Sequence, residues 1–311
     1  MAENKGYNVE NLTDYVKLNQ DAIIRSIVLG DKYGDTVANL RKQLNVKTSE
    51  KLNIMNVTAV LQDGSKCGWN PNGGTDFSER EIKTAIAKLN DEYCELDLLG
   101  KFAEYLVKFG SEDMVNNFPF EREIVGEIEK KVNKEIERQV WQGDTSASGS
   151  TDLIDGFLTI AEGADSASTI TVEIASGSSI YDAVQQVIMA IPEELLDEAV
   201  VFLSPANFRA LTFEMVAKNL YHYEPGVIEV ADYVFPGTSI RVHKTMGLSG
   251  VNDKIYASVW DNMVYGTDLM NDKEQVRVWF DDKDELERVK IRFNFGVNTL
   301  FPDAVVLGTI G

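Results

Sequence analysis

The stretch Phe118–Asp144 reads FPFEREIVGEIEKKVNKEIERQVWQGD, and its pattern decides the fold. Pro119 suits the first turn of a helix, where a missing N–H removes no hydrogen bond. Glu121 and Glu123 place negative charge at the positive end of the helix dipole. Gly143 provides a stop. The stretch therefore predicts one unbroken helix of about 22 residues, roughly 33 Å long.

The apolar residues of this helix recur at every fourth position. They are Phe120, Ile124, Ile128, Val132, Ile136 and Val140. Because a helical turn takes about 3.6 residues, the stripe drifts by about 40° at each step and winds around the helix. We therefore expect the helix to contact several elements in succession. Its polar face carries opposite charges at favourable spacings, Glu127 with Lys131 and Glu135 with Arg138.

Composition and charge exclude several classes of protein. The 311 residues allow one elaborate domain or two modest ones. No run approaches the roughly 18 apolar residues of a membrane span, and the start lacks a secretory signal. Cys67 and Cys94 are too few for a disulfide scaffold or a four-ligand zinc site, so we expect reduced thiols. The net charge of −20 argues against nucleic-acid binding through a basic groove. Solubility alone explains such a charge, which also suits a surface that faces DNA without binding it.

Residues 1–51 are expected to form an N-terminal arm. Residues 12–28 carry a helical apolar stripe, and a second short helix is predicted over Thr36–Leu44. The segment has too little apolar area to fold alone, so it packs either on its own subunit or on a neighbour.

Residues 52–93 predict a long two-stranded ribbon. An apolar run over 53–62 leads into a tip rich in Gly, Asn and Pro, and 77–93 returns with Ile82, Thr84 and Ile86 on one side. Such a ribbon is marginal in water and needs a partner surface. The candidate contact residues at its tip are Lys66, Trp69, Asn70 and Pro71. The Trp side chain either anchors a contact with another subunit or folds back on its own loop.

The remaining chain mixes helices and strands. Residues 96–109 predict a short helix, and 179–265 predict an α/β region. There, Ser179 begins a capping box, AVVFL (199–203) is a buried strand, and Ser204 starts a helix over 206–213.

The end of the chain is β structure. Residues 274–280 lead through an acidic turn into an alternating strand over Leu286–Val297, roughly 40 Å long. Its length is close to that of the long helix, so we expect the two to lie side by side. The closing PDAVVLGTIG returns as a short strand.

The sequence does not favour catalysis or a bound cofactor. It contains no phosphate loop, dinucleotide fingerprint or GxSxG elbow. His222 and His243 are interpreted as structural because they lie far apart in sequence. The acidic residues Asp281, Asp282 and Asp284 are interpreted as a solvated turn rather than a cation site. We expect no enzyme activity, cofactor or metal. A cytoplasmic α/β hydrolase built on 179–265 is the enzyme alternative, and it lacks a convincing nucleophile.

Taken in order, these elements resemble the major capsid proteins of tailed double-stranded-DNA phages, which have the Hong Kong 97-type fold. The stretches that carry the resemblance are PFEREIVGEIEKKVNKEIERQVWQGD (119–144), LIDGFL (153–158), AVVFLSPANFRAL (199–211) and RFNFGVNTLFPDAVVLG (292–308). The resemblance covers nearly all of the chain from about residue 50.

The resemblance implies an α+β fold with four parts. They are the N-terminal arm (1–51), an extended β-hairpin loop (52–93) that reaches over a neighbouring subunit, a peripheral domain (94–151 and 272–300) and an α/β axial domain (152–271 and 301–311). Phe118–Trp141 would be the spine helix of the peripheral domain, next to a long β-hairpin. Its apolar stripe, from Ile124 to Val140, would be the packing face.

The resemblance also implies a role. The chain would be a structural protein of the virion that assembles in the host cytoplasm into pentamers and hexamers of an icosahedral shell around packaged DNA. Its partners would be itself, a portal protein at one vertex and a separate scaffolding protein, with no membrane. Some relatives cross-link a ribbon Lys to an Asn of a neighbour, and most do not. Lys66 with Asn294 or Asn298 is the matching arrangement here.

The alternative with the same fold is an encapsulin, a bacterial compartment that holds enzyme cargo. An encapsulin tends to begin with a packed helix. The extended arm and ribbon expected here favour the phage protein.

Overall fold

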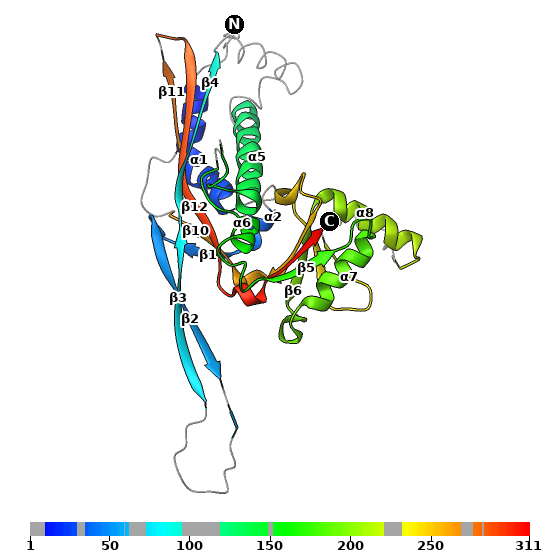
Figure 1. The fold of residues 1–311 in the computed structure, drawn as a ribbon. Helices are drawn as coiled ribbons and strands as arrows, with labels where there is room; N and C mark the ends of the chain where they lie inside the picture. The colour runs from blue at the N-terminus through cyan, green and yellow to red at the C-terminus, as the bar shows by residue number, and fades with distance from the viewer. Residues whose placement is uncertain are drawn as a thin grey trace.

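The computed structural model describes residues 10–29, 35–58, 60–61, 73–94, 119–148, 152–220, 232–268, 276–281 and 283–311. An elongated unit lies beside a compact unit that has a sheet of its own, and a two-stranded ribbon projects from the body (Figure 1). The fold is α+β, as the sequence predicts.

The elongated unit combines the long helix with a five-stranded sheet. The helix is α5 (Pro119–Gln142), which begins at the predicted proline. The sheet strands are β1 (Arg41–Leu44), β10 (Met263–Thr267), β12 (Leu286–Thr299), β11 (Val276–Asp281) and β4 (Ala85–Cys94). Helix α1 (Glu10–Leu29) packs against both α5 and β11. Of the two predicted partners for the N-terminal segment, α1 therefore uses its own subunit.

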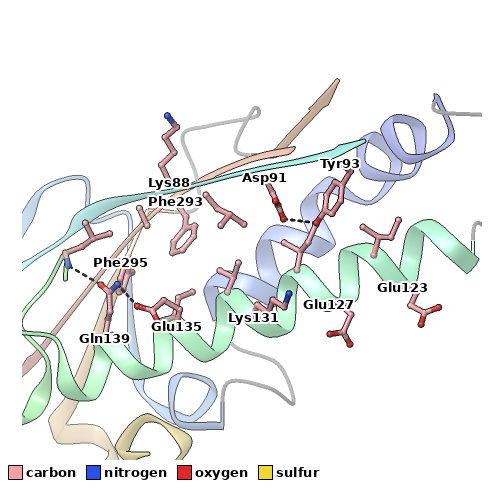
Figure 2. Close-up of a pocket in the computed structure, with 17 residues that line it drawn as sticks. Lys88, Asp91, Tyr93, Glu123, Glu127, Lys131, Glu135, Gln139, Phe293 and Phe295 are labelled. Atoms are coloured by element: carbon pink, nitrogen blue, oxygen red, sulfur yellow. Dashed lines mark hydrogen bonds between the residues drawn. The ribbon is translucent and has the colours of Figure 1, made fainter. Parts of the chain in front are cut away.

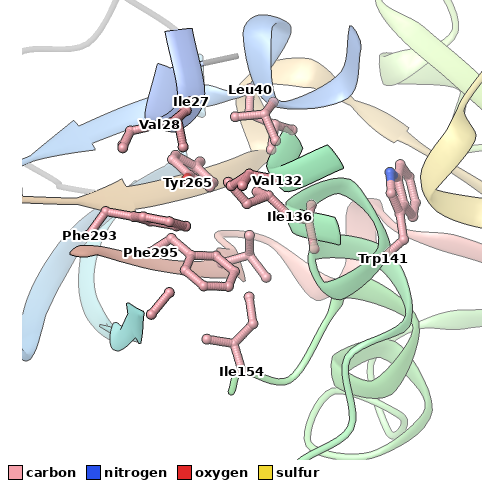
Figure 3. Packing of buried hydrophobic residues seen from close by; sticks show 14 of the residues in the cluster. Ile27, Val28, Leu40, Val132, Ile136, Trp141, Ile154, Tyr265, Phe293 and Phe295 are labelled. Atoms are coloured by element: carbon pink, nitrogen blue, oxygen red, sulfur yellow. The ribbon is translucent and has the colours of Figure 1, made fainter. Parts of the chain in front are cut away.

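Strand β12 and helix α5 share one hydrophobic core, which confirms that they lie side by side. Along β12, alternate residues from Val289 to Val297 are buried. Figure 3 shows Phe293 and Phe295 of this strand close to Val132 and Ile136 of α5. The sheet face that the alternation predicts is therefore the face that the helix covers.

Helix α5 meets different elements along its length, as its winding stripe predicts. Near its start it packs on α1. Further along, the Glu129 carboxylate accepts a hydrogen bond from the Ser26 hydroxyl at 3.3 Å, and Glu137 accepts one from the Val37 N–H at 2.9 Å. Its last turns contact α6 (Phe157–Glu162) and the short helix η2 (Met246–Leu248).

Of the two charge pairs predicted on α5, one forms as expected. Arg138 contacts Glu135 at 2.7 Å. Glu127 instead contacts Lys130, three residues on, at 3.6 Å. Lys131 lines a groove between the helix and the sheet. Both spacings are allowed on a helix, and both lysines are exposed.

Trp141 joins the helix to the compact unit. Its ring is fully buried, with centroids 5.0 Å from Phe202 and 5.3 Å from Tyr256. Its indole N–H donates to the Thr36 hydroxyl at 3.2 Å. One side chain therefore ties together α5, the N-terminal segment and the compact sheet.

The compact unit is a six-stranded sheet covered on one face by α7 (Ile180–Ala190) and α8 (Pro205–Ala217). Its strands, in spatial order, are β5 (Ile170–Ile174), β13 (Val306–Ile310), β9 (Lys254–Val259), β6 (Ala199–Leu203), β8 (Arg241–Lys244) and β7 (Asp232–Val234). In β6, Val201 faces these helices, and Phe202 faces Trp141. Burial on both faces explains the continuous apolar run.

Both predicted helix caps in the compact unit form. The Ser179 hydroxyl accepts from the Asp182 N–H at 3.1 Å, and the Ser204 hydroxyl accepts from the Asn207 N–H at 3.2 Å. Helix α8 runs beyond the predicted residue 213. The described part of the chain also contains the short 3₁₀ helices η1 (Glu193–Leu195), η3 (Trp260–Asn262) and η4 (Pro302–Ala304).

The ribbon consists of β2 (Ser49–Thr58) and β3 (Gly74–Lys83) in antiparallel register. The expectation that 77–93 is one strand of the ribbon is wrong. The strand breaks at Thr84, and β4 pairs with β12 in the body. The break also separates Ile82, which is fully buried, from Ile86, which is 64% exposed, although the sequence places them on one side.

The predicted helix over Thr36–Leu44 is also wrong in its second half. Helix α2 covers only Asp35–Asn39, and β1 follows it as a strand parallel to β10. A tertiary pairing with a distant strand overrides the local pattern there. The predicted helix over 96–109 lies outside the described residues.

Substitutions at two glycines test this packing. A Cβ on Gly296 would lie 2.0 Å from the Lys83 carbonyl oxygen, whereas a Cβ on Gly126 of α5 would meet nothing within 4 Å. We expect Gly296→Ala to lower the free energy of unfolding by about 2 kcal/mol or more, because the crossing strands must move apart. Gly126→Ala should raise it by about 1 kcal/mol through helix propensity.

Urea unfolding followed by circular dichroism measures both changes. Equal stability of the two variants would contradict a close crossing of the chain over β12.

Candidate assembly surfaces

The ribbon exposes an apolar face. Met55 of β2 lies directly opposite Phe77 of β3, so their side chains are on the same face. They are 60% and 77% exposed, and Val57 on the same face is 55% exposed. Isolated exposed apolar residues are ordinary, whereas an adjacent set on a thin ribbon is a candidate contact surface.

The root of the ribbon, in contrast, is firmly packed. Ile82 lies in a small core with Leu52, Ile54, Val264 and Leu300. The Asn298 side chain donates to the Glu81 carbonyl at 2.7 Å, and Asn294 donates to the Lys47 carbonyl at 3.1 Å. The apolar face of the ribbon therefore projects from a root that is packed against the body.

A groove of about 740 Å³ runs between α5 and the β4 edge of the elongated sheet. Its apolar lining includes Ile124, Ile128, Val132 and Ile136 of α5, with Phe293 and Phe295 of β12. Figure 2 shows the two Phe rings pointing from the sheet toward the helix, with the carboxylates of Glu123 and Glu127 directed away from the sheet. Inside the groove, the Tyr93 hydroxyl donates to Asp91 at 2.8 Å.

The sequence predicts the helix side of this groove but not the groove itself. Within the predicted stripe, Ile128, Val132, Ile136 and Val140 are buried, and Ile124 is half-buried. One side of the apolar stripe packs on α1, and the other side lines the groove. The groove lies on the β4 side because α1 covers β11 rather than β4.

A buried acid lies near the start of α5. Glu287 of β12 is fully buried, and neither carboxylate oxygen has a hydrogen-bond partner among the described residues. Burial, and secondly the charge of Glu121 on α5, raise the pKa of Glu287 to about 8. The carboxyl group is therefore largely protonated at neutral pH.

The sequence-based predictions do not include this acid, although the pattern of β12 contains a signal for it. Glu287 continues the inward alternation of Val289, Ile291 and Phe293 by one more step. Extending the buried face to its end would have placed a carboxyl group in the core.

The predicted contact residues at the ribbon tip, Lys66, Trp69, Asn70 and Pro71, lie outside the described residues, as does Cys67. Cys94 ends β4 as a free thiol.

The residues considered for metal binding have other surroundings. His243 is buried, with its ring 5.7 Å from Phe202 and 5.3 Å from Trp260, and His222 lies outside the described residues. Arg288 forms ion pairs with Asp281 and with Asp284, the latter at 2.7 Å, and Asp282 is not described. Within the described ranges, no group of His, Cys, Asp or Glu is placed to hold a metal ion. No described helix is long and apolar enough to span a membrane.

Known proteins match this chain in structure rather than in sequence. No protein-family model and no curated relative matches it. A chain of the satellite phage P4 procapsid matches with a TM-score of 0.60 at 9% identity, covering 99% of this chain and 93% of that chain. The Gordonia phage Cozz structure matches with a TM-score of 0.55 at 13% identity, covering 89% and 86%.

This is the Hong Kong 97-type capsid fold.

The same fold also occurs in an encapsulin. The SrpI encapsulin of Synechococcus elongatus matches with a TM-score of 0.54 at 11% identity, covering 92% of this chain and 88% of that chain. Phage and encapsulin relatives therefore match almost equally well. Helix α1 is a packed helix rather than an extended arm, so the N-terminal segment gives no reason to favour the phage protein over an encapsulin.

The pKa of Glu287 makes the stability of the capsid fold depend on pH. Between the ordinary value of 4.5 and about 8, the folded chain retains a proton that the unfolded chain loses. The free energy of unfolding should therefore fall as pH rises through this window, by about 1.4 kcal/mol per pH unit from this group.

Glu287→Gln removes the titrating group and should flatten that slope. Glu173→Gln, at an exposed position on β5, is the control and should leave it unchanged. Urea unfolding at pH 5, 6, 7 and 8 measures the slopes, and parallel slopes for Glu287→Gln and the unaltered chain would contradict the assignment.

Proposed function

We propose that this chain is a shell subunit that assembles with copies of itself. The observation that carries the proposal is the β2–β3 ribbon, whose apolar face at Met55, Val57 and Phe77 is not covered within the subunit. A chain that folds as a monomer has no use for such a projection, since two strands alone are marginal in water. A second copy would cover the face and stabilise the ribbon.

We propose further that the shell is a phage capsid. Its subunits form pentamers and hexamers of an icosahedral shell that encloses double-stranded DNA, and the chain is a virion component assembled in the host cytoplasm. The capsid fold and the matched P4 procapsid support this proposal. The net charge of −20 suits an inner surface that repels DNA rather than fixing it in place. A scaffolding protein and a portal protein are the proposed partners, and the subunit has neither catalytic activity nor a cofactor.

The proposed domains follow the two sheets. The elongated unit corresponds to the peripheral domain with α5 as its spine helix, and the compact unit corresponds to the axial domain. The proposed domain boundaries change at three strands, because β1, β4 and β10 pair within the elongated sheet. The ranges first assigned place β1 in the arm, all of β4 except Cys94 in the extended loop, and β10 in the axial domain.

An encapsulin-type compartment is the second candidate, favoured by the SrpI match and by the packed α1. The genes beside this one distinguish the two. Portal, terminase and protease genes support the phage capsid, and a single cargo-enzyme gene supports the compartment.

We propose that the shell is not covalently cross-linked. The amide groups of Asn294 and Asn298 both donate hydrogen bonds within the subunit, at the root of the ribbon. As acceptors for Lys66 of a neighbour, they would have to leave these bonds. Boiled shells should therefore give an intact monomer band on denaturing gels, and a ladder of multimers would contradict the proposal.

Phe77→Ser tests the assembly surface. It should reduce shell yield at least about ten-fold while leaving subunit stability within about 0.5 kcal/mol, because an exposed side chain contributes little to folding. Phe213→Ser on α8 is the matched control, since Phe213 is 72% exposed and far from the ribbon in sequence.

Negative-stain microscopy and sedimentation of the expressed protein, with candidate scaffold added, measure the yield. Equal losses for both variants would contradict a contact specific to the ribbon.

A further inference from the structure

The ribbon is tied to the body by an ion pair near the point where it emerges. Arg80 of β3 donates from Nη2 to both carboxylate oxygens of Asp165, at 2.8 and 2.7 Å. The same nitrogen lies 3.1 Å from the side-chain oxygen of Asn298. Among the described residues, no hydrogen bond or ion pair joins the ribbon to the body nearer its tip, and β3 from Gly74 to Glu79 is exposed.

Asp165 is held in place independently of Arg80. It lies between α6 and β5, and only 7% of the residue is exposed. The Thr299 hydroxyl, at the end of β12, donates to its carboxylate at 2.8 Å. Its backbone carbonyl accepts from both the N–H and the hydroxyl of Thr169, at 2.9 and 3.0 Å. The ribbon is therefore fastened to a rigid corner where the two units meet.

This pair differs from the other ion pair of the ribbon. Lys51 and Glu79 are 2.5 Å apart, but their side chains are 72% and 54% exposed, and they join the two ribbon strands to each other. Exposed pairs of this kind stabilise little. The Arg80 and Asp165 side chains are only 23% and 8% exposed, so their attraction is less screened.

The pair lies near the root of the ribbon, so a change at the pair would move the outer part of the ribbon. On the body side of the pair, Ile82 is fixed in the root core, and Ile54 of β2, which pairs with Ser78 two residues beyond Arg80, belongs to the same core. On the tip side of the pair, β3 continues for six residues to Gly74, roughly 20 Å at 3.3 Å per residue. Phe77 lies three residues beyond Arg80, roughly 10 Å, so a rotation about the root displaces the Met55 and Phe77 face and displaces the end of β3 about twice as far.

We propose that Arg80 and Asp165 are positioning residues that set the angle at which the ribbon leaves the body. Through this angle they determine where the apolar face of Met55 and Phe77 meets the next subunit. The last step rests on the proposed shell function, whereas the angle itself is a property of the single subunit. The two are therefore tested by separate measurements.

The angle is measured on the unassembled full-length subunit by electron–electron distance spectroscopy. Spin labels are placed at Met55→Cys on the ribbon and Met189→Cys on α7, positions that are 60% and 79% exposed, after Cys67→Ser and Cys94→Ser. Arg80→Met removes the charge and keeps the apolar stem. It should widen the distance distribution at least about two-fold, because the ribbon then samples many angles. Lys51→Met, which breaks the exposed pair on the same ribbon, should leave the width unchanged.

Two further variants separate positioning from general stability. Arg80→Lys restores a positive charge and should recover much of the narrow distribution. Asp165→Asn removes the opposite charge while its amide oxygen can still accept from Thr299, so it should widen the distribution even if Arg80→Met does not fold. A width that is unchanged in Arg80→Met, or unchanged in Asp165→Asn where only that variant folds, would overturn the proposal.

The shell assay then tests the consequence for assembly. Arg80→Met should raise the protein concentration needed for assembly about ten-fold, while Lys51→Met changes it less than about two-fold. A wide distance distribution with unchanged assembly would support the positioning role and count against the ribbon as the assembly contact.

Discussion

The winding apolar stripe of α5 is the constraint on which the rest of the structure depends. A stripe that turns around a helix cannot be buried by one sheet, so the chain supplies α1, the N-terminal segment, α6 and the compact sheet in turn. The series ends at Trp141, whose ring touches Phe202 and Tyr256 of the compact sheet. Burying a Trp ring on all sides is among the larger single contributions to a core. The last turn of α5 therefore helps to place the two units relative to each other.

Two surfaces of the elongated unit remain exposed in the single subunit. Helix α1 covers the β11 side of the sheet, and the β4 side keeps the groove. The ribbon extends beyond both units, with its root packed and its apolar face exposed. The proposed shell gives a physical reason for this arrangement: surfaces that one copy cannot bury are buried by others.

Buried acids have two different effects in this chain: one lowers stability as pH rises, and the other positions the ribbon. Glu287 is buried beside Glu121, where neither burial nor a second acid favours ionisation. Asp165 is buried beside Arg80, with a Thr hydroxyl to support it. The first arrangement makes the elongated unit sensitive to pH. The second holds a projecting element at a defined angle.

The sequence by itself determined the elements with strong local patterns. The proline start and four-residue period of α5, the alternation of β12, the Ser caps of α7 and α8, and the apolar run of β6 are all present as predicted. Each depends on a period or a cap that residues close in sequence define. The fold class and the capsid resemblance followed from the order of these elements.

Only the tertiary structure decided what distant residues do to one another. Residues 41–44 became a strand because β10, more than two hundred residues later, offers an edge. The run 77–93 divided at Thr84 because β12 competes with the ribbon for its second half. The Arg80–Asp165 pair joins residues 85 positions apart, and no local pattern marks either one. Local sequence fixes periodicity, but the choice among partners depends on the free energy of pairing in three dimensions.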